Sequence, residues 1–247
     1  MVNNFSSGGA AINQLNNWIG ASLNVVPINL DCPTANITEK PALSESMFLK
    51  SFILGMETIN KNADLICLGE MGIGNTTIAS AIAAALFGGN GLEWVGRGTG
   101  IDDTQLVHKA SVIDSALRLH RDYLNDPIQI LMRLGGHEFA AIAGAALAAR
   151  FFKIPVILDG FASTTAASIL EVSRADSLAH CLVSHKSAEQ GHALLLKKIG
   201  KQPLLDLSLR LGEATGAALA AGLVQAAVAT HIGMSTFSEA GISGPTR

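Results

Sequence analysis

The sequence predicts an α/β fold of three layers, in which a Rossmann-like parallel sheet lies between helices. Short apolar segments alternate along the chain with longer amphipathic or alanine-rich segments, the pattern of a parallel sheet covered on both faces. Glycine-rich or polar turns follow several of the apolar segments directly. With 49% hydrophobic and 15% charged residues among 247, the composition suits one compact domain over 1–247.

The alternation assigns each element a place in the chain. Strands are expected at the short apolar runs 22–28, 64–68, 154–158 and 179–184. Helices are expected at 10–19, 44–61, 76–87, 104–120, 128–133, 138–152, 163–174, 188–199 and 215–231. The polar, proline-bearing segment 29–41 breaks the alternation and is predicted to lie outside the sheet.

The last predicted helix lies in the longest uncharged stretch, 214–232, which approaches membrane-spanning length. Alanine and glycine dominate this stretch and contribute little insertion energy, and Gln225 and His231 interrupt it. We therefore expect a buried, tightly packed helix and no membrane partner. The N-terminal residues lack the basic and apolar regions of a secretory signal, so no export is expected.

Charge and cysteine content narrow the class of protein further. The formal net charge of −3 provides no basic field for nucleic acid or an anionic membrane. The three cysteines Cys32, Cys67 and Cys181 lie far apart and form no CxxC pair, which favours neither a disulfide framework nor a zinc site. A reducing, cytoplasmic compartment is the simplest interpretation.

The most informative motif is the glycine-rich turn after the strand 64–68. It reads Gly69-Glu-Met-Gly-Ile-Gly-Asn-Thr-Thr77 and leads into the helix 76–87. Glycines let the backbone approach a ligand closely, and the unpaired N–H groups of a helix N-terminus attract anions. Asn75 stands where a P-loop has its lysine, so a monophosphate fits better than a triphosphate with Mg²⁺. The alternative is a turn that merely joins strand to helix.

Two further turns have similar features at predicted strand ends. Leu158-Asp-Gly-Phe-Ala-Ser-Thr-Thr165 follows the strand 154–158, and Ser184-His-Lys-Ser-Ala-Glu-Gln-Gly191 follows the strand 179–184. The carboxyl ends of parallel strands meet at one edge, so we expect these turns to converge with the first one there.

Glu213 and Lys109 each have two explanations from sequence. Glu213 precedes a long, nearly uncharged helix, so its carboxylate either caps that helix and favours its dipole or acts as a general base with a pKa raised by apolar surroundings. Lys109 follows the loop Gly96-Arg-Gly-Thr-Gly100 and is either an ordinary solvated lysine or a flexible charge for a phosphate.

Other catalytic arrangements find no support. His137 and His185 lie outside any HxxxH or HExxH spacing, so no catalytic metal is expected. Ser163 and Ser187 lack the G-x-S-x-G turn of a hydrolase nucleophile, and hydroxyls beside glycine turns more often cap helices or hold phosphates.

Taken together, the motifs resemble the nicotinate-nucleotide–dimethylbenzimidazole phosphoribosyltransferase family, which activates the lower ligand of cobalamin. The resemblance starts at Asn4-Phe-Ser-Ser-Gly-Gly-Ala-Ala11 and covers essentially the whole chain. The segments that carry it, in the order of the family, are the turn 69–77, Leu158-Asp-Gly-Phe161, Ser184-His-Lys-Ser-Ala-Glu189, Leu209-Arg-Leu-Gly-Glu213, Gly216-Ala-Ala-Leu219 and the tail Met234-Ser-Thr-Phe-Ser-Glu-Ala-Gly-Ile-Ser243.

The resemblance implies transfer of phosphoribose from nicotinate mononucleotide to dimethylbenzimidazole by a homodimer, without metal or cofactor. It makes Glu213 the base that removes the azole proton and places Glu70 beside the ribose or reacting centre. The phosphate-binding residues that it implies are Gly72, Ile73, Gly74, Asn75, Thr76, Lys109, Gly160 and Ser187.

The sequence departs from the family at its start, where a Pro-Pro-Gly-Ser-Leu-Gly segment and an Asp-His-Gly segment are absent. In the family these segments help to form the small helical domain and the pocket for the aromatic base. The small helical subdomain is therefore expected to be incomplete. The alternative function is a catalytically weak homologue that only binds nicotinate mononucleotide or α-ribazole phosphate.

Overall fold

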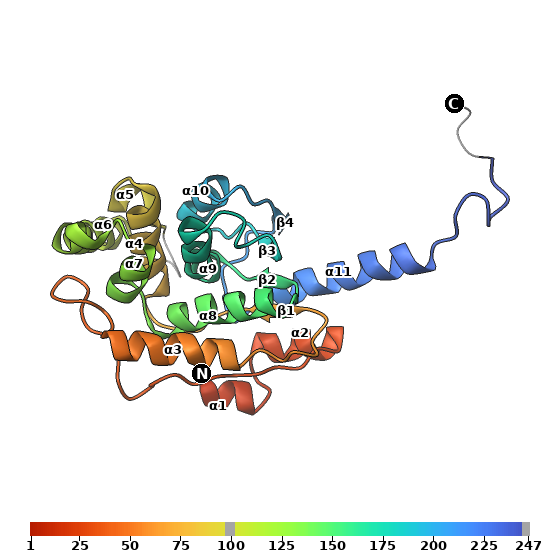
Figure 1. Ribbon diagram of the computed structural model, residues 1–247, viewed down its shortest axis with the longest axis horizontal. Coiled ribbons are helices and arrows are strands. Elements are labelled where there is room, and N and C mark those ends of the chain that lie inside the picture. The colour runs from red at the N-terminus through yellow and green to blue at the C-terminus, as the bar shows by residue number, and fades with distance from the viewer. Residues whose placement is uncertain (97–101, 244–247) are drawn as a thin grey trace.

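A parallel four-stranded sheet forms the centre of the protein. The computed structural model describes residues 1–96 and 102–243. The strands are β1 (Ile66–Leu68), β2 (Val156–Leu158), β3 (Cys181–His185) and β4 (Pro203–Leu205), in the order β1-β2-β3-β4 (Figure 1). Leu68 lies opposite Leu158 and Leu158 lies opposite Val183, so the carboxyl ends of β1 and β2 are level, and β3 continues two residues further to His185 at the same edge of the sheet.

Helices cover both faces of this sheet, which confirms the predicted α/β class. Val156 and Leu158 point to the face covered by α8 (His137–Phe151) and α9 (Phe161–Ser173). The side chain of Ile157 points to the other face, where it packs against the first half of α11 (Thr215–Gly233). All three strand residues are fully buried, as expected for a parallel sheet.

The strand order explains why α11 lies alone against its face. The strands follow one another in chain order and in one direction, so right-handed crossovers place the connecting helices on the same face. The opposite face is covered by α11, which follows β4, and α2 (Ala11–Ile19) packs on α11 in turn.

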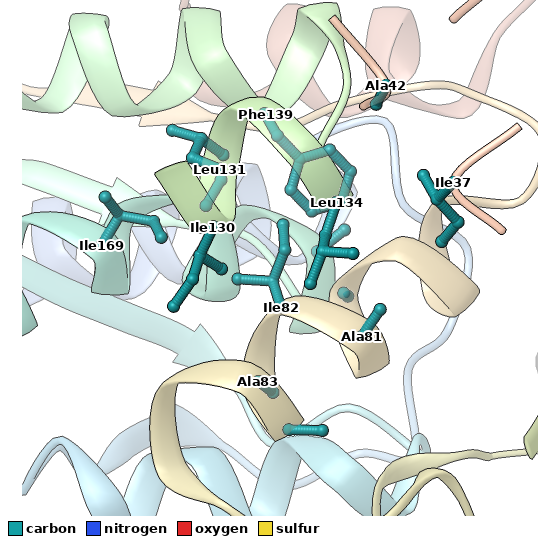
Figure 2. Close-up of a cluster of buried hydrophobic side chains, with 14 of the residues drawn as sticks. Ile37, Ala42, Ala81, Ile82, Ala83, Ile130, Leu131, Leu134, Phe139 and Ile169 are labelled. Atoms are coloured by element: carbon teal, nitrogen blue, oxygen red, sulfur yellow. The ribbon is translucent and has the colours of Figure 1, made fainter. Parts of the chain in front are cut away.

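A large helical core lies beside the sheet. It unites α4 (Asn75–Phe87), α5 (Gly91–Trp94), α6 (Asp103–His120), α7 (Pro127–Leu134) and α10 (Gln190–Lys198) with α8 and α9. The exposed 3-10 turn η1 (Arg121–Tyr123) follows α6. Figure 2 shows its centre, where Ile82 of α4 meets Leu131 and Leu134 of α7 and Phe139 of α8. The helix α3 (Glu45–Glu57) packs along α8. This core holds the start of α4 rigidly at the sheet edge.

A smaller helical group stands at the other side of the sheet. Phe5 of α1 (Val2–Ser6) and Ile12 of α2 form an apolar cluster with Ala218 of α11. These contacts fix the first half of α11, and therefore the residues just before it, from the side opposite to the sheet.

Some predicted elements are wrong. The segment 22–28 is not a strand: it pairs with no sheet edge, Val25 contacts the cluster around Phe5, and Leu23 is exposed. The strand β4 was not predicted, since it has only three residues and begins with proline. The short helices α1 and α5 were also not predicted.

The prediction that the last helix is buried holds only for its first half. Gly216 to Ala221 include the buried residues of α11, whereas Leu223, Val228 and Ile232 are 48%, 49% and 77% exposed. Figure 1 shows this second half projecting from the rest of the protein. Within 1–96 and 102–243, α11 is the one helix long and apolar enough to span a membrane, and 28% of its apolar window is buried.

Candidate active site

The turns after β1, β2 and β3 meet at the sheet edge, as the sequence predicts. The backbone N–H of Asp159 donates to the carbonyl of Leu68 at 3.0 Å, which joins the β2 turn to β1. The Ser184 hydroxyl donates to the Asp159 carbonyl at 2.6 Å, which joins β3 to the same turn. Three loops that are far apart in sequence therefore share one short edge.

Glu70 occupies the centre of the first turn. Its carboxylate accepts hydrogen bonds from the Asn75 side-chain amide and from the backbone N–H of Gly72. Burial raises the pKa of Glu70 to about 7, against the opposing effect of the Asn75 hydrogen bond, and the nearby charges of Glu138 and Asp159 raise it further. This carboxyl group therefore titrates near neutral pH.

Glu213 lies against the same turn. Its backbone N–H donates to the Glu70 carbonyl at 3.1 Å, and its φ of 62° is in the left-handed region. Burial raises the pKa of its carboxyl group. Its Oε2 atom is buried and has no hydrogen-bond partner among the described residues. An unpartnered carboxylate oxygen with a raised pKa is suited to accept a proton.

Asp159, and not Glu213, supplies the side-chain hydrogen bonds to the first turn of α11. Asp159 accepts the backbone N–H of Ala214 at 3.1 Å and that of Ala217 at 3.0 Å. Sequence reasoning missed Asp159, although it stands in the quoted motif Leu158-Asp-Gly-Phe161, because a cap supplied from a distant strand has no local sequence signal.

Lys109 reaches the start of α4 from α6. Its Nζ atom donates to the Thr76 hydroxyl at 2.8 Å and to the Gly96 carbonyl at 3.3 Å. Desolvation lowers the pKa of Lys109, and the charge of Glu189 raises it. The lysine is therefore not an ordinary solvated one. The remainder of its predicted loop, 97–100, lies outside the described residues.

The other predicted phosphate-binding residues surround this point. Gly74 precedes α4 with a φ of 88°, and the side chain of Ile73 is exposed. Gly160 precedes α9 and faces Ser187, whose N–H donates to Nδ1 of His192 at 3.0 Å. The structure thus brings Gly160 and Ser187 together, as it does Thr76 and Lys109.

A cavity of about 390 Å³ opens beside Lys109 and contains residues that sequence reasoning did not assign a role. Gly96, which accepts from Lys109, is part of its wall, and Glu189 and Arg210 supply its charged groups. Both charged residues lie in motifs that carry the family resemblance. Their place in these motifs was the sequence signal that could have marked them as site residues. The full lining is Val95, Gly96, Leu106, Ala188, Glu189, Gln190 and Arg210.

Metal ligands do not gather at this edge. Within the described part of the chain, no group of three or more His, Cys, Asp or Glu residues is arranged to hold a metal ion. This edge has three carboxyl groups with raised pKa values, those of Glu70, Asp159 and Glu213, together with a partly buried ammonium group and glycine turns before two helices.

Comparisons with known proteins confirm the family that the sequence motifs resemble. A family model described as phosphoribosyltransferase matches residues 1–242. The nicotinate-nucleotide–dimethylbenzimidazole phosphoribosyltransferase of Rhizobium rhizogenes is 54% identical over 243 residues, covering 98% of this chain and 72% of that protein. The Methylocella silvestris enzyme of the same name is 51% identical over 244 residues, with 99% and 72% covered.

Solved structures agree. The crystal structure of CobT from Thermus thermophilus matches with a TM-score of 0.85 at 36% identity and covers 99% of this chain and 79% of that one. The family model, the relatives and the fold thus converge, and the chain belongs to the nicotinate-nucleotide–dimethylbenzimidazole phosphoribosyltransferase family.

Proposed function

We propose that this protein transfers phosphoribose from nicotinate mononucleotide to dimethylbenzimidazole, giving α-ribazole phosphate and nicotinate. A ring nitrogen of the azole attacks the anomeric carbon of the ribose, and the bond to the pyridinium nitrogen of nicotinate breaks. The β-linkage is thereby inverted to an α-linkage. The azole loses its N–H proton as the new bond forms, so a base is required next to that nitrogen.

The observation that carries this proposal is the environment of Glu213. Its buried Oε2 atom has no protein partner in the described residues, and burial raises its pKa. We assign it the azole proton. The Glu70 carboxylate accepts from the Asn75 amide and the Gly72 N–H, which hold it at the sheet edge, and we assign it to the ribose or the reacting centre.

In this proposal the phosphate binds at the start of α4, on the side that faces Lys109 and away from Glu70. Gly72, Ile73, Gly74, Asn75 and Thr76 supply the turn and the helix N-terminus, with its unpaired N–H groups. Lys109 adds a positive charge at Thr76, and Gly160 and Ser187 approach from the neighbouring turns. No metal or cofactor enters the reaction, because nicotinate leaves from a positively charged ring nitrogen and catalysis consists of positioning and one proton removal.

The test is direct. The protein is incubated with nicotinate mononucleotide and dimethylbenzimidazole in the presence of EDTA, and nicotinate and α-ribazole phosphate are followed by chromatography. We expect both products in equal amounts. Tight binding of either nucleotide without release of nicotinate would reject transfer in favour of a protein that only binds.

We further propose a homodimer. The support is the row of exposed apolar side chains on the second half of α11 and after it, which includes Leu223, Val228, Ile232, Met234 and Phe237. Sedimentation velocity at micromolar concentration should give a dimer, and monomer alone would reject this assembly.

We also propose a cytoplasmic location without nucleic-acid or membrane partners. The three cysteines are unpaired, and the net charge of −3 is unfavourable for polyanions. Fractionation of cells after lysis without detergent should leave the protein in the soluble fraction, and recovery with the membranes would contradict the proposal.

A further inference from the structure

The residues before α11 adopt a conformation that is costly for this sequence. Gly212, Glu213 and Ala214 have φ values of 84°, 62° and 63°, so three successive residues are left-handed. The left-handed conformation is unfavourable for Glu213 and Ala214, because each has a Cβ atom that crowds the backbone there. Contacts from elsewhere in the protein must therefore hold this segment.

Asp159 supplies the most direct of those contacts. Its carboxylate uses both oxygens: Oδ2 accepts the N–H of Ala214 at 3.1 Å, and Oδ1 accepts the N–H of Ala217 at 3.0 Å. The N–H of Gly216 also stabilises the carboxylate. These donors belong to the first turn of α11, where a carboxylate also favours the helix dipole.

Asp159 is itself rigidly placed. It directly follows β2, its N–H is bound to β1 through Leu68, and its carbonyl is bound to β3 through Ser184. Its side chain is 2% exposed. The groups that its carboxylate binds, at the start of α11, are therefore fixed relative to the sheet edge.

His185 and Asp159 lie so close to the first turn of α11 that there is no space for a side chain at Gly216. A Cβ atom on Gly216 would lie 2.1 Å from Nδ1 of His185 and 2.9 Å from Oδ1 of Asp159. The His185 ring lies 4.0 Å from Asp159, and burial lowers the pKa of this histidine, so its neutral form prevails there. Burial raises the pKa of Asp159 to about 6, and the α11 amides oppose that rise.

We propose that Asp159 is a positioning residue for the transferase reaction: it fastens the first turn of α11 to the sheet edge and thereby holds Glu213 in its left-handed conformation beside Glu70. This inference rests on the proposed function, because it assigns the proton transfer to Glu213. Asp159 acts only through the backbone, and Glu213 remains the group that takes the proton.

The first test is Asp159→Asn. Asparagine has one carbonyl oxygen, so its amide group faces one of the two backbone N–H donors and that hydrogen bond is lost. We expect kcat to fall at least about tenfold, while the KM for nicotinate mononucleotide stays within about threefold, because the Lys109 side of the site is untouched. A change in KM with unchanged kcat would overturn the proposal.

A matched control separates positioning from general loss of stability. Asp126 caps α7, where its Oδ1 accepts the N–H groups of Ile128 and Gln129 at 2.8 and 3.4 Å, away from the site. Asp126→Ala should lower the melting temperature, since the helix loses its cap, but leave kcat within about twofold. An equal loss of kcat in both variants would assign the effect to stability and overturn the proposal.

Two combined variants test the route through Glu213. If Asp159 acts through Glu213, the double variant Asp159→Asn with Glu213→Gln should be no slower than Glu213→Gln alone, whereas independent roles would multiply the losses. Ala214→Gly removes the cost of the left-handed conformation at 214, so it should restore kcat at least about threefold in the Asp159→Asn background. Multiplied losses, or no restoration, would contradict the proposal.

A readout without turnover keeps this inference distinct from the proposed function. Amide hydrogen exchange over 214–221 should be faster in Asp159→Asn than in the unaltered protein, and unchanged in Asp126→Ala. Unchanged exchange in Asp159→Asn would reject the fastening of α11 whether or not the protein turns over. Absence of product from the unaltered protein, with exchange altered as expected, would instead reject the proposed function alone.

Discussion

The start of α4 separates two regions of opposite chemistry. Asn75 and Thr76 are consecutive, yet the Asn75 amide binds the Glu70 carboxylate, whereas the Thr76 hydroxyl accepts from Lys109. The first region, Glu70 with Glu213, contains carboxyl groups with raised pKa values, and we call it the acid side. The second, Lys109 with Arg210 and the cavity next to them, is the cation side. Two consecutive residues at the start of one helix thus contact groups of opposite charge.

The comparison predicts different kinetic signatures for the two sides. Loss of a group on the acid side should reduce the rate at saturation, because proton removal belongs to the transition state. Loss of a group on the cation side should raise the nucleotide requirement, because the phosphate is bound equally in the ground and transition states.

The largest effect is expected for Glu213→Gln. The amide keeps the shape of the side chain but cannot take a proton, so kcat should fall by about 10²–10⁴. The dissociation constant for nicotinate mononucleotide, measured by calorimetry, should change little. Glu57→Gln, at an exposed glutamate that ends α3, is the control and should retain full activity. Undiminished turnover of Glu213→Gln would remove Glu213 from the mechanism.

The next effect is expected for Lys109→Met, which keeps the apolar stem and removes the charge. A hydrogen bond to a charged group contributes about 1.5–3 kcal/mol, so the KM for nicotinate mononucleotide should rise by roughly 10-fold to 100-fold, with a smaller change in kcat. Steady-state kinetics at varied nucleotide concentration provide the measurement, with Lys50→Ala, at an exposed lysine of α3, as the control. An unchanged KM would mean that Lys109 does not contact the phosphate.

A smaller effect is expected on the acid side for the stability of Glu70→Gln, and this effect should depend on pH. The pKa of Glu70 is about 7 in the folded protein against an ordinary value of 4.5, so the folded state binds this proton more tightly and stability falls as pH rises from 4.5 through 7. Glu70→Gln removes that cost. It should stabilise the protein by roughly 1–3 kcal/mol at pH 8, because one pKa unit corresponds to about 1.4 kcal/mol.

The measurement is urea unfolding of both proteins between pH 4.5 and pH 8. The stability difference should nearly vanish at the acidic end, where Glu70 is protonated in the folded state and about half protonated in the unfolded state. A Glu70→Gln variant less stable than the unaltered protein at pH 8 would show that the carboxylate is favourably paired, contrary to the direction given by burial.

The smallest effect is expected for Arg210→Ala. Arg210 lines the cavity but is exposed, so solvent screens its charge and the KM for the nucleotide should rise only by about twofold to fivefold. The effect should disappear at high salt, whereas that of Lys109→Met should persist because Lys109 is partly desolvated. A loss in kcat larger than the change in KM would place Arg210 on the acid side instead.

The sequence predicts the class of fold and the meeting of the turns well, because both follow from local patterns. The apolar runs that became β1, β2 and β3 are bounded by glycine or polar turns, and parallel strands bring such turns to one edge. The run 22–28 misled because Val25 packs against the cluster formed by α1, α2 and the start of α11 and the run pairs with no strand. Strand β4 was missed because three residues carry too little pattern.

In the site, too, features with a local sequence pattern could be predicted and contacts between distant residues could not. The sequence placed Thr76 and Lys109 at the same phosphate, because the resemblance assigns both to it, but it did not predict the hydrogen bond between them. The cap supplied by Asp159 was not, because its partners Ala214 and Ala217 lie more than fifty residues away. Likewise, composition alone could not reveal that only the first half of α11 is covered: Ala220 is fully buried and Leu223 is 48% exposed on one helix of uniform character.

The place of α11 in the strand order has a consequence for how the protein is made. Thr76, Lys109, Gly160 and Ser187 have all been synthesised once β3 and its turn are complete, but Glu213 and the turn that Asp159 holds come after β4. During translation the growing chain therefore acquires these proposed phosphate-binding groups before its proposed base. A nascent chain that binds the nucleotide before Glu213 is made lacks the proposed base and cannot complete the transfer. The base reaches its place only when α11 packs on the uncovered face of the sheet.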